Sequence, residues 1–527
     1  MYAARYSLLV VLLGGWISAI SRELDHNRLE HLLKSIRAVI AAKLKSASPL
    51  VTSGVGRDTC LDAENVHRLA KCPAVEEYIT TYMELVHPLF PFLCPKEFEK
   101  RAAAPNLTQD LAATVGCQHC DGGSYEARTG SSWAYLEQAM SYSRDLYFPR
   151  VSLTSVQALF CQLIAGFGLE SSMTAEAAVL AQSLGLNRST STSVSVSSRT
   201  FWVLYYMEKT SCFVAGRIPT LQDAHISCPL PNTSEWFFDD YDWLISFVKY
   251  SRLVSKIQSR LFTITSMPQS WTANRTAVEA LQAELEKWRD SIPRRFRPGE
   301  PLRPRIMLAE PRALSIALRA HYHYRYAHLT LIWTLLHCGG GREQTATALE
   351  ELDLKTELMQ TSRGVLELTS YIEISPSTPI CLNPISALMI LFDLVIHNPY
   401  HPETTLNLAL LDVASGHFSR IEYCSRGVLP GSLILEFAHL AREYISDIRC
   451  NASGCQGGIS HHRRRLAASG MFAMPTALGQ DQCQGQDPFF APVDGQMYRL
   501  PYLGVDLMGL FDPSYSFLGG DVSLQRN

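Results

Sequence analysis

The 527-residue sequence has no large excess of charge of either sign. Its 47 lysines and arginines are nearly balanced by 50 aspartates and glutamates, which gives a formal net charge of -3 at pH 7. A protein that binds nucleic acid through its bulk normally presents a basic surface, because neutralising phosphates supplies most of the non-specific affinity. The balance excludes this mode of binding, so any contact with DNA has to come from a small part of the chain.

The sequence also lacks the short motifs that mark common catalytic sites. It contains no Gly-x-x-x-x-Gly-Lys-Ser/Thr phosphate loop, no Gly-x-Ser-x-Gly turn and no His-Glu-x-x-His pair. No expected strand leads into a glycine-rich turn that would hold a dinucleotide. We therefore predict that the chain is not an enzyme and that it has no cofactor, no catalytic residue and no metal site.

A long uninterrupted apolar run is missing as well. Residues 1–21 place an apolar segment after Arg5, interrupted by Gly14 and Gly15, and end in small residues. This is the layout of a secretory signal peptide and is too short for a confident membrane span. The alternative is that the segment belongs to a shortened or misassembled amino terminus. With a signal peptide, the five Asn-x-Ser/Thr sequons would describe a secreted or endoplasmic-reticulum helical glycoprotein; they start at Asn106, Asn187, Asn232, Asn274 and Asn451.

The most informative stretch is residues 199–231. Phe201 and Trp202 open a strongly apolar segment, and Glu208 and Lys209 are the only charges in its middle. Helical spacing predicts a buried helix that stops at Gly216. After the stop, residues 220–223 can start a short second helix, and the prolines of the Cys-Pro-Leu-Pro segment at 228–231 favour an extended exit.

Helical periodicity continues through most of the chain, and no convincing period-two alternation is present. We therefore predict an all-α fold with a flexible C-terminal tail. Residues 22–58 are expected to form an amphipathic helix and a linker, and residues 451–527, where the composition changes, are expected to be the tail. The main helices are expected at 132–146, 155–167, 241–265, 277–292, 314–337, 349–369 and 383–398.

Four stretches in the same order resemble the fungal-specific transcription factor domain, the regulatory module that follows the zinc cluster in fungal regulators. One is the 199–231 stretch, in which Glu208-Lys209 replaces the usual Asp-Arg. The others are Tyr82 to Phe92, the segment 181–188 with Asn187 where histidine is usual, and a proline-rich turn at 398–402. The residues that carry the resemblance, all expected to be structural, are His87, Pro88, Phe90, Pro91, Gly185, Leu186, Phe201, Trp202, Gly216, Arg217, Pro219, Asp223, Pro229 and Pro231.

The zinc cluster that this resemblance implies is not visible. It needs six cysteines in one compact run, whereas the 14 cysteines here are scattered and form a single Cys-x-x-Cys pair, Cys117 and Cys120. We expect that pair to lie in a loop with two free thiols. Histidines such as His321 and His328 are expected at the polar edges of an aromatic helix packed in the core, rather than at a metal.

The resemblance implies a regulatory domain at residues 59–450 and the function of a fungal transcription regulator. It implies control of a pathway-specific gene set, for instance a secondary-metabolite cluster, and a location in the nucleus. The implied partners are promoter DNA, reached directly or through a DNA-binding partner, a second copy in a homodimer, a coactivator and a small-molecule effector. Acidic and apolar residues alternate near the end of the 451–527 tail, which suits an activation segment.

Overall fold

The fold is known from a computed structural model of the chain. It describes residues 31–32, 35, 38, 74–93, 107–120, 132, 135, 152–164, 170–188, 196–230, 237–238, 241–263, 271–302, 311–337, 348–374, 383–427 and 429–452. Within these residues there are twelve α-helices and one pair of two-residue strands, β1 (Phe237–Phe238) and β2 (Tyr241–Asp242). The predicted all-α class is therefore confirmed.

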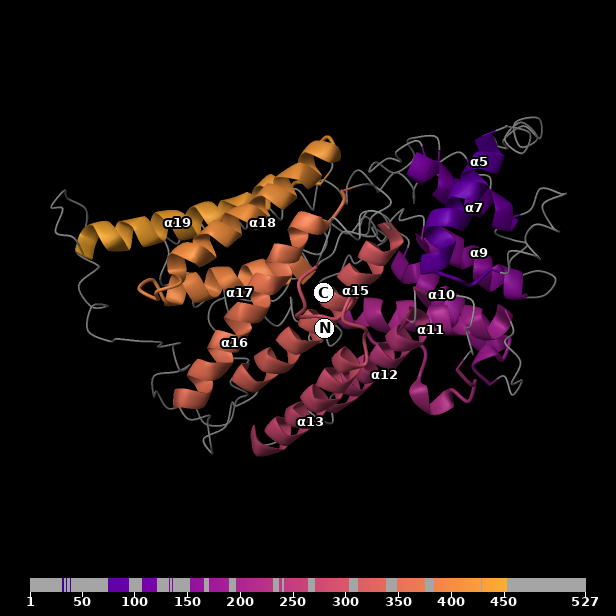
Figure 1. Cartoon of the computed structure of the whole chain (residues 1–527), viewed down its shortest axis with the longest axis horizontal. Helices are drawn as coiled ribbons and strands as arrows, with labels where there is room; N and C mark the ends of the chain where they lie inside the picture. The colour runs from indigo at the N-terminus through magenta and orange to yellow at the C-terminus, as the bar shows by residue number, and fades with distance from the viewer. Residues whose placement is uncertain are drawn as a thin grey trace, which may run out of the picture.

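The helices form three groups along the molecule (Figure 1). At one end lie α5 (Ala74–Thr81), α7 (Leu107–Cys120), α9 (Leu153–Ile164), α10 (Glu170–Ser183) and α11 (Val196–Ala215). The middle holds α12 (Trp243–Leu261), α13 (Trp271–Asp290) and α15 (Pro311–His337). The other end holds α16 (Ala348–Glu367), α17 (Asn383–His397), α18 (Thr404–Cys424) and α19 (Ser432–Ala452).

One continuous apolar core joins these groups. It runs from Tyr82 to Ile445 and also includes Leu32 from the predicted N-terminal amphipathic segment. Helix α17 is apolar around its whole circumference, which is the pattern of a helix covered on all sides, and it is buried against α16, α18 and α19. Helix α11 joins the first group to the middle, because it packs on α9, α10 and α12.

Local sequence signals explain where several helices begin and end. Helix α12 begins at an N-cap, since the Asp242 side chain accepts a hydrogen bond from the Ile245 amide at 3.1 Å. Helix α11 ends at Gly216, whose φ of 65° is the left-handed conformation that glycine adopts without strain. The Arg217 amide donates to the Cys212 carbonyl at 2.8 Å and so closes a Schellman turn.

The loop predicted around the Cys-x-x-Cys pair was wrong, because this segment is the end of α7. Packing decides the structure here: α7 lies so close to α5 that a Cβ on Gly116 would be 1.8 Å from the Tyr78 carbonyl oxygen. Cys117 is buried and Cys120 is exposed, and the Sγ of Cys120 lies 3.1 Å from Thr81 Oγ1 of α5. A contact between two backbones is invisible in the sequence, so no local signal predicted a helix here.

Helices α10, α18 and α19 are further elements that the periodicity did not predict; α18 follows the proline-rich turn directly. Several expectations concern residues that the structure does not describe. These are the signal-like segment 1–21, most of 22–58, most of the expected helix 132–146, and the tail beyond residue 452. Among the described residues, no helix is both long enough and apolar enough to cross a membrane.

Candidate functional site

The residues singled out in the sequence gather around α11 and the segment 216–230 that follows it. Phe201 and Trp202 are fully buried in the core, as predicted. The indole Nε1 of Trp202 donates to the Pro229 carbonyl at 2.9 Å, so the extended exit is fastened to the start of α11. Between Trp202 and Pro229 the chain turns back through a short 3₁₀ helix, Asp223–His225. The sequence predicted that a short helix could start at residues 220–223, close to this position.

Glu208 holds the beginning of this segment. Its side chain is 1% exposed, and its carboxylate accepts hydrogen bonds from the amides of Thr220 at 2.5 Å and Leu221 at 3.0 Å. Burial raises the pKa of Glu208 above its usual range, although both backbone donors favour the charged form. Both amides lie outside any helix, and the carboxylate supplies the hydrogen-bond acceptor that a helix would otherwise provide.

Lys209 holds the same segment from the other side. It is also 1% exposed, and its Nζ donates to the Leu221 carbonyl at 2.6 Å and to Ser255 Oγ of α12 at 3.1 Å. The same Nζ lies 3.5 Å from Asp223 Oδ2. One buried ammonium group therefore joins α11, α12 and the returning segment.

Asp223 is the point where three side chains meet. Tyr205 donates its phenol hydrogen to Asp223 Oδ1 at 2.5 Å, and Ser255 donates to Oδ2. Burial and the carboxylate raise the pKa of Tyr205 far above its usual range, so this phenol stays protonated. We call the set formed by Tyr205, Glu208, Lys209, Asp223 and Ser255 the α11 clamp.

Asn187 fastens the middle of the returning segment. It follows Gly185, whose φ is 69°, and lies in a short 3₁₀ turn with Leu186. Its side-chain amide donates to the His225 carbonyl at 2.8 Å, and its own carbonyl accepts from the amides of Ser227 and Cys228 at 2.9 and 3.0 Å. Asn187 is buried by these contacts, so no N-linked glycan fits on it in the folded chain.

The His-Pro-Leu-Phe-Pro segment forms a second cluster, next to the N-terminal half of α11. His87 is buried and its Nε2 is 3.0 Å from the Leu93 carbonyl. Burial lowers the pKa of His87 to about 4, so the ring is neutral at pH 7. The Phe92 carbonyl accepts from Gln157 Nε2 of α9 at 2.9 Å and from Thr200 Oγ1 of α11 at 3.0 Å.

The structure therefore brings the singled-out residues together in two clusters on one helix. The first contains the 87–91 residues, in which Phe90 and Pro91 are buried and Pro88 is partly exposed. The second contains the residues from Gly185 to Pro229, with Arg217 and Pro219 partly exposed at the turn; Pro231 lies outside the described residues. Sequence reasoning missed Ser255, Gln157 and Thr200, because a serine, a glutamine or a threonine within a helix carries no positional signal of its own.

His321 and His328 of α15 are both buried, and His328 is held by neighbouring side chains. His328 Nδ1 is 3.2 Å from Thr361 Oγ1, and its Nε2 is 3.0 Å from Glu357 and 3.2 Å from Gln282 Nε2. The hydrogen bond to His328 lowers the pKa of Glu357. The described residues contain no group of three or more His, Cys, Asp or Glu side chains that could hold a metal ion.

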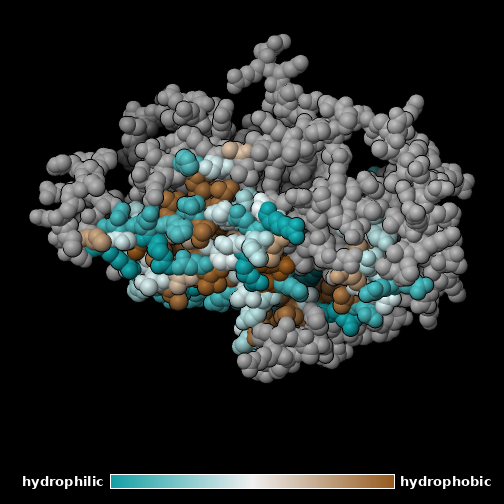
Figure 2. All heavy atoms as spheres, turned by 90° about the horizontal axis from the view of Figure 1, so that it is seen from above, coloured by the Kyte–Doolittle hydropathy of each residue, from teal (hydrophilic) through white to brown (hydrophobic). Residues whose placement is uncertain are grey.

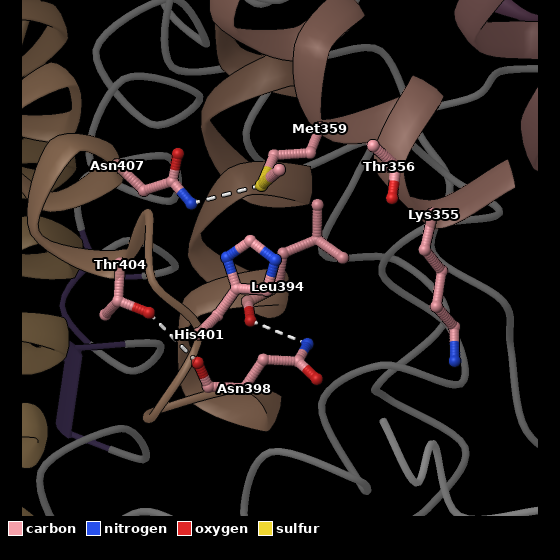
Figure 3. A pocket seen from close by; sticks show the side chains of 8 residues that line it. All are labelled: Lys355, Thr356, Met359, Leu394, Asn398, His401, Thr404 and Asn407. Carbon is pink, nitrogen blue, oxygen red and sulfur yellow. Dashed lines mark hydrogen bonds between the residues drawn. The ribbon is translucent and has the colours of Figure 1, made fainter. Parts of the chain in front are cut away.

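A small pocket lies where the predicted proline-rich turn joins α17 to α18 (Figure 3). Its wall includes Met359 of α16 and Asn407 of α18, and the Asn407 side-chain amide lies 3.3 Å from the Met359 sulfur. Thr404 Oγ1 donates to the Asn398 carbonyl at 3.0 Å and closes the turn. The space accommodates about one water molecule, which is too little for a metabolite.

The geometry of both clusters is that of a structural support. Their polar groups point at one another and at backbone atoms, and within the clamp the phenol of Tyr205 and the ammonium group of Lys209 are both occupied. The clamp positions the returning segment against α11 and α12.

Two comparisons with known proteins, one with family models and one with curated proteins, agree on one class. Residues 79–290 match the family model described as the fungal specific transcription factor domain. The match spans both clusters and ends with α13. No solved structure matches the chain.

The similar curated proteins are fungal regulators. An ABC-transporter-regulating transcription factor of Aspergillus fumigatus is 25% identical over 325 residues, which is 55% of this chain and 36% of the relative. An uncharacterized transcriptional regulatory protein of Schizosaccharomyces pombe is 21% identical over 324 residues, 56% of this chain and 49% of the relative. A fumonisin cluster-specific transcription factor of Gibberella moniliformis is 26% identical over 107 residues, 19% of this chain and 16% of the relative. The matched stretch thus spans between about a sixth and a half of each of these relatives.

Proposed function

Residues 79–290 form a fungal specific transcription factor domain, and from this we propose that the chain is a fungal transcription regulator and works in the nucleus. The match of this domain is the observation that carries the proposal. It belongs to a family of transcription factors and not of enzymes, which agrees with the predicted lack of catalysis. We propose that the regulatory domain extends beyond the match, over residues 59–450; its C-terminal part is supported by the apolar core of the described residues, which continues to Ile445.

The domain acts as a rigid support rather than as a reactive site. The α11 clamp and the His87 cluster fix the returning segment and the 87–93 turn on opposite halves of one helix. Promoter DNA is reached through a small part of the chain or through a DNA-binding partner, since the charge balance offers no broad basic surface. The tail 451–527 supplies the segment that contacts a coactivator.

The target genes are a pathway-specific set. Two of the similar proteins are described as regulators of ABC transporters and of a fumonisin cluster, so transporter genes and secondary-metabolite genes are the first sets to examine. The pocket in Figure 3 does not support a small-molecule effector at the α17–α18 turn, because it is too small. An effector would have to bind elsewhere or open a new cavity.

The proposal is tested by localisation and transcription in a filamentous fungus. The chain is tagged at its carboxyl terminus and expressed from its own transcript, and transcripts are compared between the wild-type strain and a deletion strain. We expect nuclear signal and a limited set of changed transcripts. Complementation with Lys209→Met, which breaks the clamp, should restore fewer of these transcripts than complementation with Lys249→Met, an exposed lysine on α12. Signal in the secretory pathway would refute the proposal.

The secreted glycoprotein is the second candidate, and burial argues against it. Asn187 and Asn274 are the sequon asparagines whose side chains the structure describes, and both are buried. A glycan on either would require the local structure to open. Treatment of the same extract with a glycosidase checks this candidate: a change in electrophoretic mobility would favour it over the regulator.

A further inference from the structure

Helix α18 exposes an apolar stripe on the side that faces away from the core. Leu406, Val413 and Tyr423 are 58%, 50% and 86% exposed, whereas large apolar side chains are usually covered. Ala409, Gly416 and Arg420 are exposed between them. These six residues follow the 3-4-3-4-3 spacing of a coiled-coil seam over three heptads. In Figure 2 apolar side chains interrupt the polar surface in the part of the molecule where α18 and α19 lie.

Gly416 lies in the middle of this stripe, and its own chain does not require it. A glycine inside a helix is unfavourable relative to alanine, so it usually has a packing reason. Gly116 and Gly364 have one: a Cβ on either would be 1.8 Å from the Tyr78 carbonyl or 1.7 Å from the Arg325 guanidinium. A Cβ on Gly416 would have nothing within 4 Å. The reason for this glycine therefore lies outside the described chain.

We propose that the α18 stripe is a self-pairing surface, on which α18 of a second copy packs in antiparallel orientation. A two-fold axis between Val413 and Gly416 makes the stripe complementary to itself. Val413 then fills the space above Gly416 of the second copy, and Leu406 packs against Tyr423 of the second copy. Each large side chain meets a small or flat one, as alternating positions of an antiparallel helix pair require.

Complementary charges favour α18 of a second copy over an unrelated apolar segment as the partner of the stripe. In the same register Arg420 lies over Ala409 of the second copy and reaches toward Asp412 of that copy, one helical turn away. Asp412 is exposed at the edge of the stripe, where it pairs with Arg442 of α19. Two symmetric pairs of Arg420 with Asp412 therefore flank the seam. A single helix pair is a small interface, so we expect a dissociation constant on the order of micromolar.

The α18 stripe would be the interface of the homodimer that the family resemblance implies. The test measures only the mass of the purified full-length chain, so its result does not depend on the proposed function. We expect a dimer at about 100 µM that dissociates on dilution. Val413→Glu should make the chain monomeric at that concentration. Val179→Glu, at a residue 52% exposed on α10, is the matched control and should remain dimeric.

Two further variants guard against misfolding and test the register. Gly416→Leu adds a side chain where the single chain has free space, so it should raise the thermal midpoint and yet abolish the dimer. Residues 406 and 423 of one chain are about 25 Å apart along the helix, so the pair Leu406→Cys with Tyr423→Cys can form disulfides only between copies. Because the native Cys424 is exposed beside Tyr423, all chains in this test carry Cys424→Ser; the double variant should then yield a covalent dimer on oxidation, whereas neither single variant nor the Cys424→Ser chain alone should.

Several results would overturn the proposal. A wild-type chain that is monomeric at about 100 µM would do so, as would dimers that persist in both Val413→Glu and Gly416→Leu. Efficient cross-linking of Leu406→Cys alone would indicate parallel helices and refute the register. A monomer whose stripe becomes accessible only after removal of residues 453–527 would show that the chain covers its own stripe.

Discussion

The clearest test of the α11 clamp is Lys209→Met, which keeps most of the side-chain volume and removes the charge. The substitution deletes hydrogen bonds to the Leu221 carbonyl and to Ser255, and it leaves the buried carboxylate of Glu208 without its neighbouring cation. Hydrogen bonds to charged groups contribute about 1.5–3 kcal/mol each. The ion pair of Lys209 with Asp223 is buried only on the lysine side, because Asp223 is 44% exposed, so the cost of about 3–5 kcal/mol for breaking a fully buried pair is an upper bound. Because these two figures describe overlapping effects, we expect a loss of about 2–4 kcal/mol in the free energy of unfolding.

Urea unfolding followed by circular dichroism measures this loss. With an m-value near 3 kcal/mol per molar, the midpoint falls by roughly 0.7 to 1.3 M. Lys249→Met on the exposed face of α12 should change the free energy of unfolding by less than about 0.5 kcal/mol. Adding Glu208→Gln to Lys209→Met should cost less than the sum of the two single changes by about 1–3 kcal/mol, because it removes the unpaired charge. Equal midpoints for Lys209→Met and Lys249→Met would refute the clamp as a source of stability.

Three other predictions concern single positions. Gly116→Ala places a Cβ against the Tyr78 carbonyl and should lower the free energy of unfolding by about 2 kcal/mol or more, measured by urea unfolding beside the harmless Gly416→Ala. His87 has a pKa of about 4 in the folded chain and about 6.5 in the unfolded chain, so between these pH values only the unfolded chain binds a proton there. The free energy of unfolding should therefore fall as the pH drops from about 6.5 to 4, and His87→Gln should show a shallower decline. An unchanged pH profile in the variant would contradict this account. Asn187→Gln should leave electrophoretic mobility unchanged while loosening the segment held at His225, seen as faster proteolysis there.

The sequence predicted most of the helices correctly because apolar residues recur at helical spacing over long stretches. It predicted the burial of Phe201 and Trp202 and the stop at Gly216 from local signals alone. It gave no signal for α10, whose alanine-rich segment has little amphipathic character, and it suggested a loop where Gly116 lies. That glycine permits two helices to touch, and only the packed structure distinguishes this use from a turn.

For the candidate site, residue types and their order were enough to indicate the class of protein, since the resemblance depends on short local patterns. What the sequence by itself determined is an all-α chain with two charges, Glu208 and Lys209, in the middle of a buried apolar helix. Only the tertiary structure decided what these charges do, because their partners Leu221, Asp223 and Ser255 lie 12 to 46 residues away. Hydrogen bonds of this range depend on how α11, α12 and the returning segment come together, and helical periodicity carries no information about that.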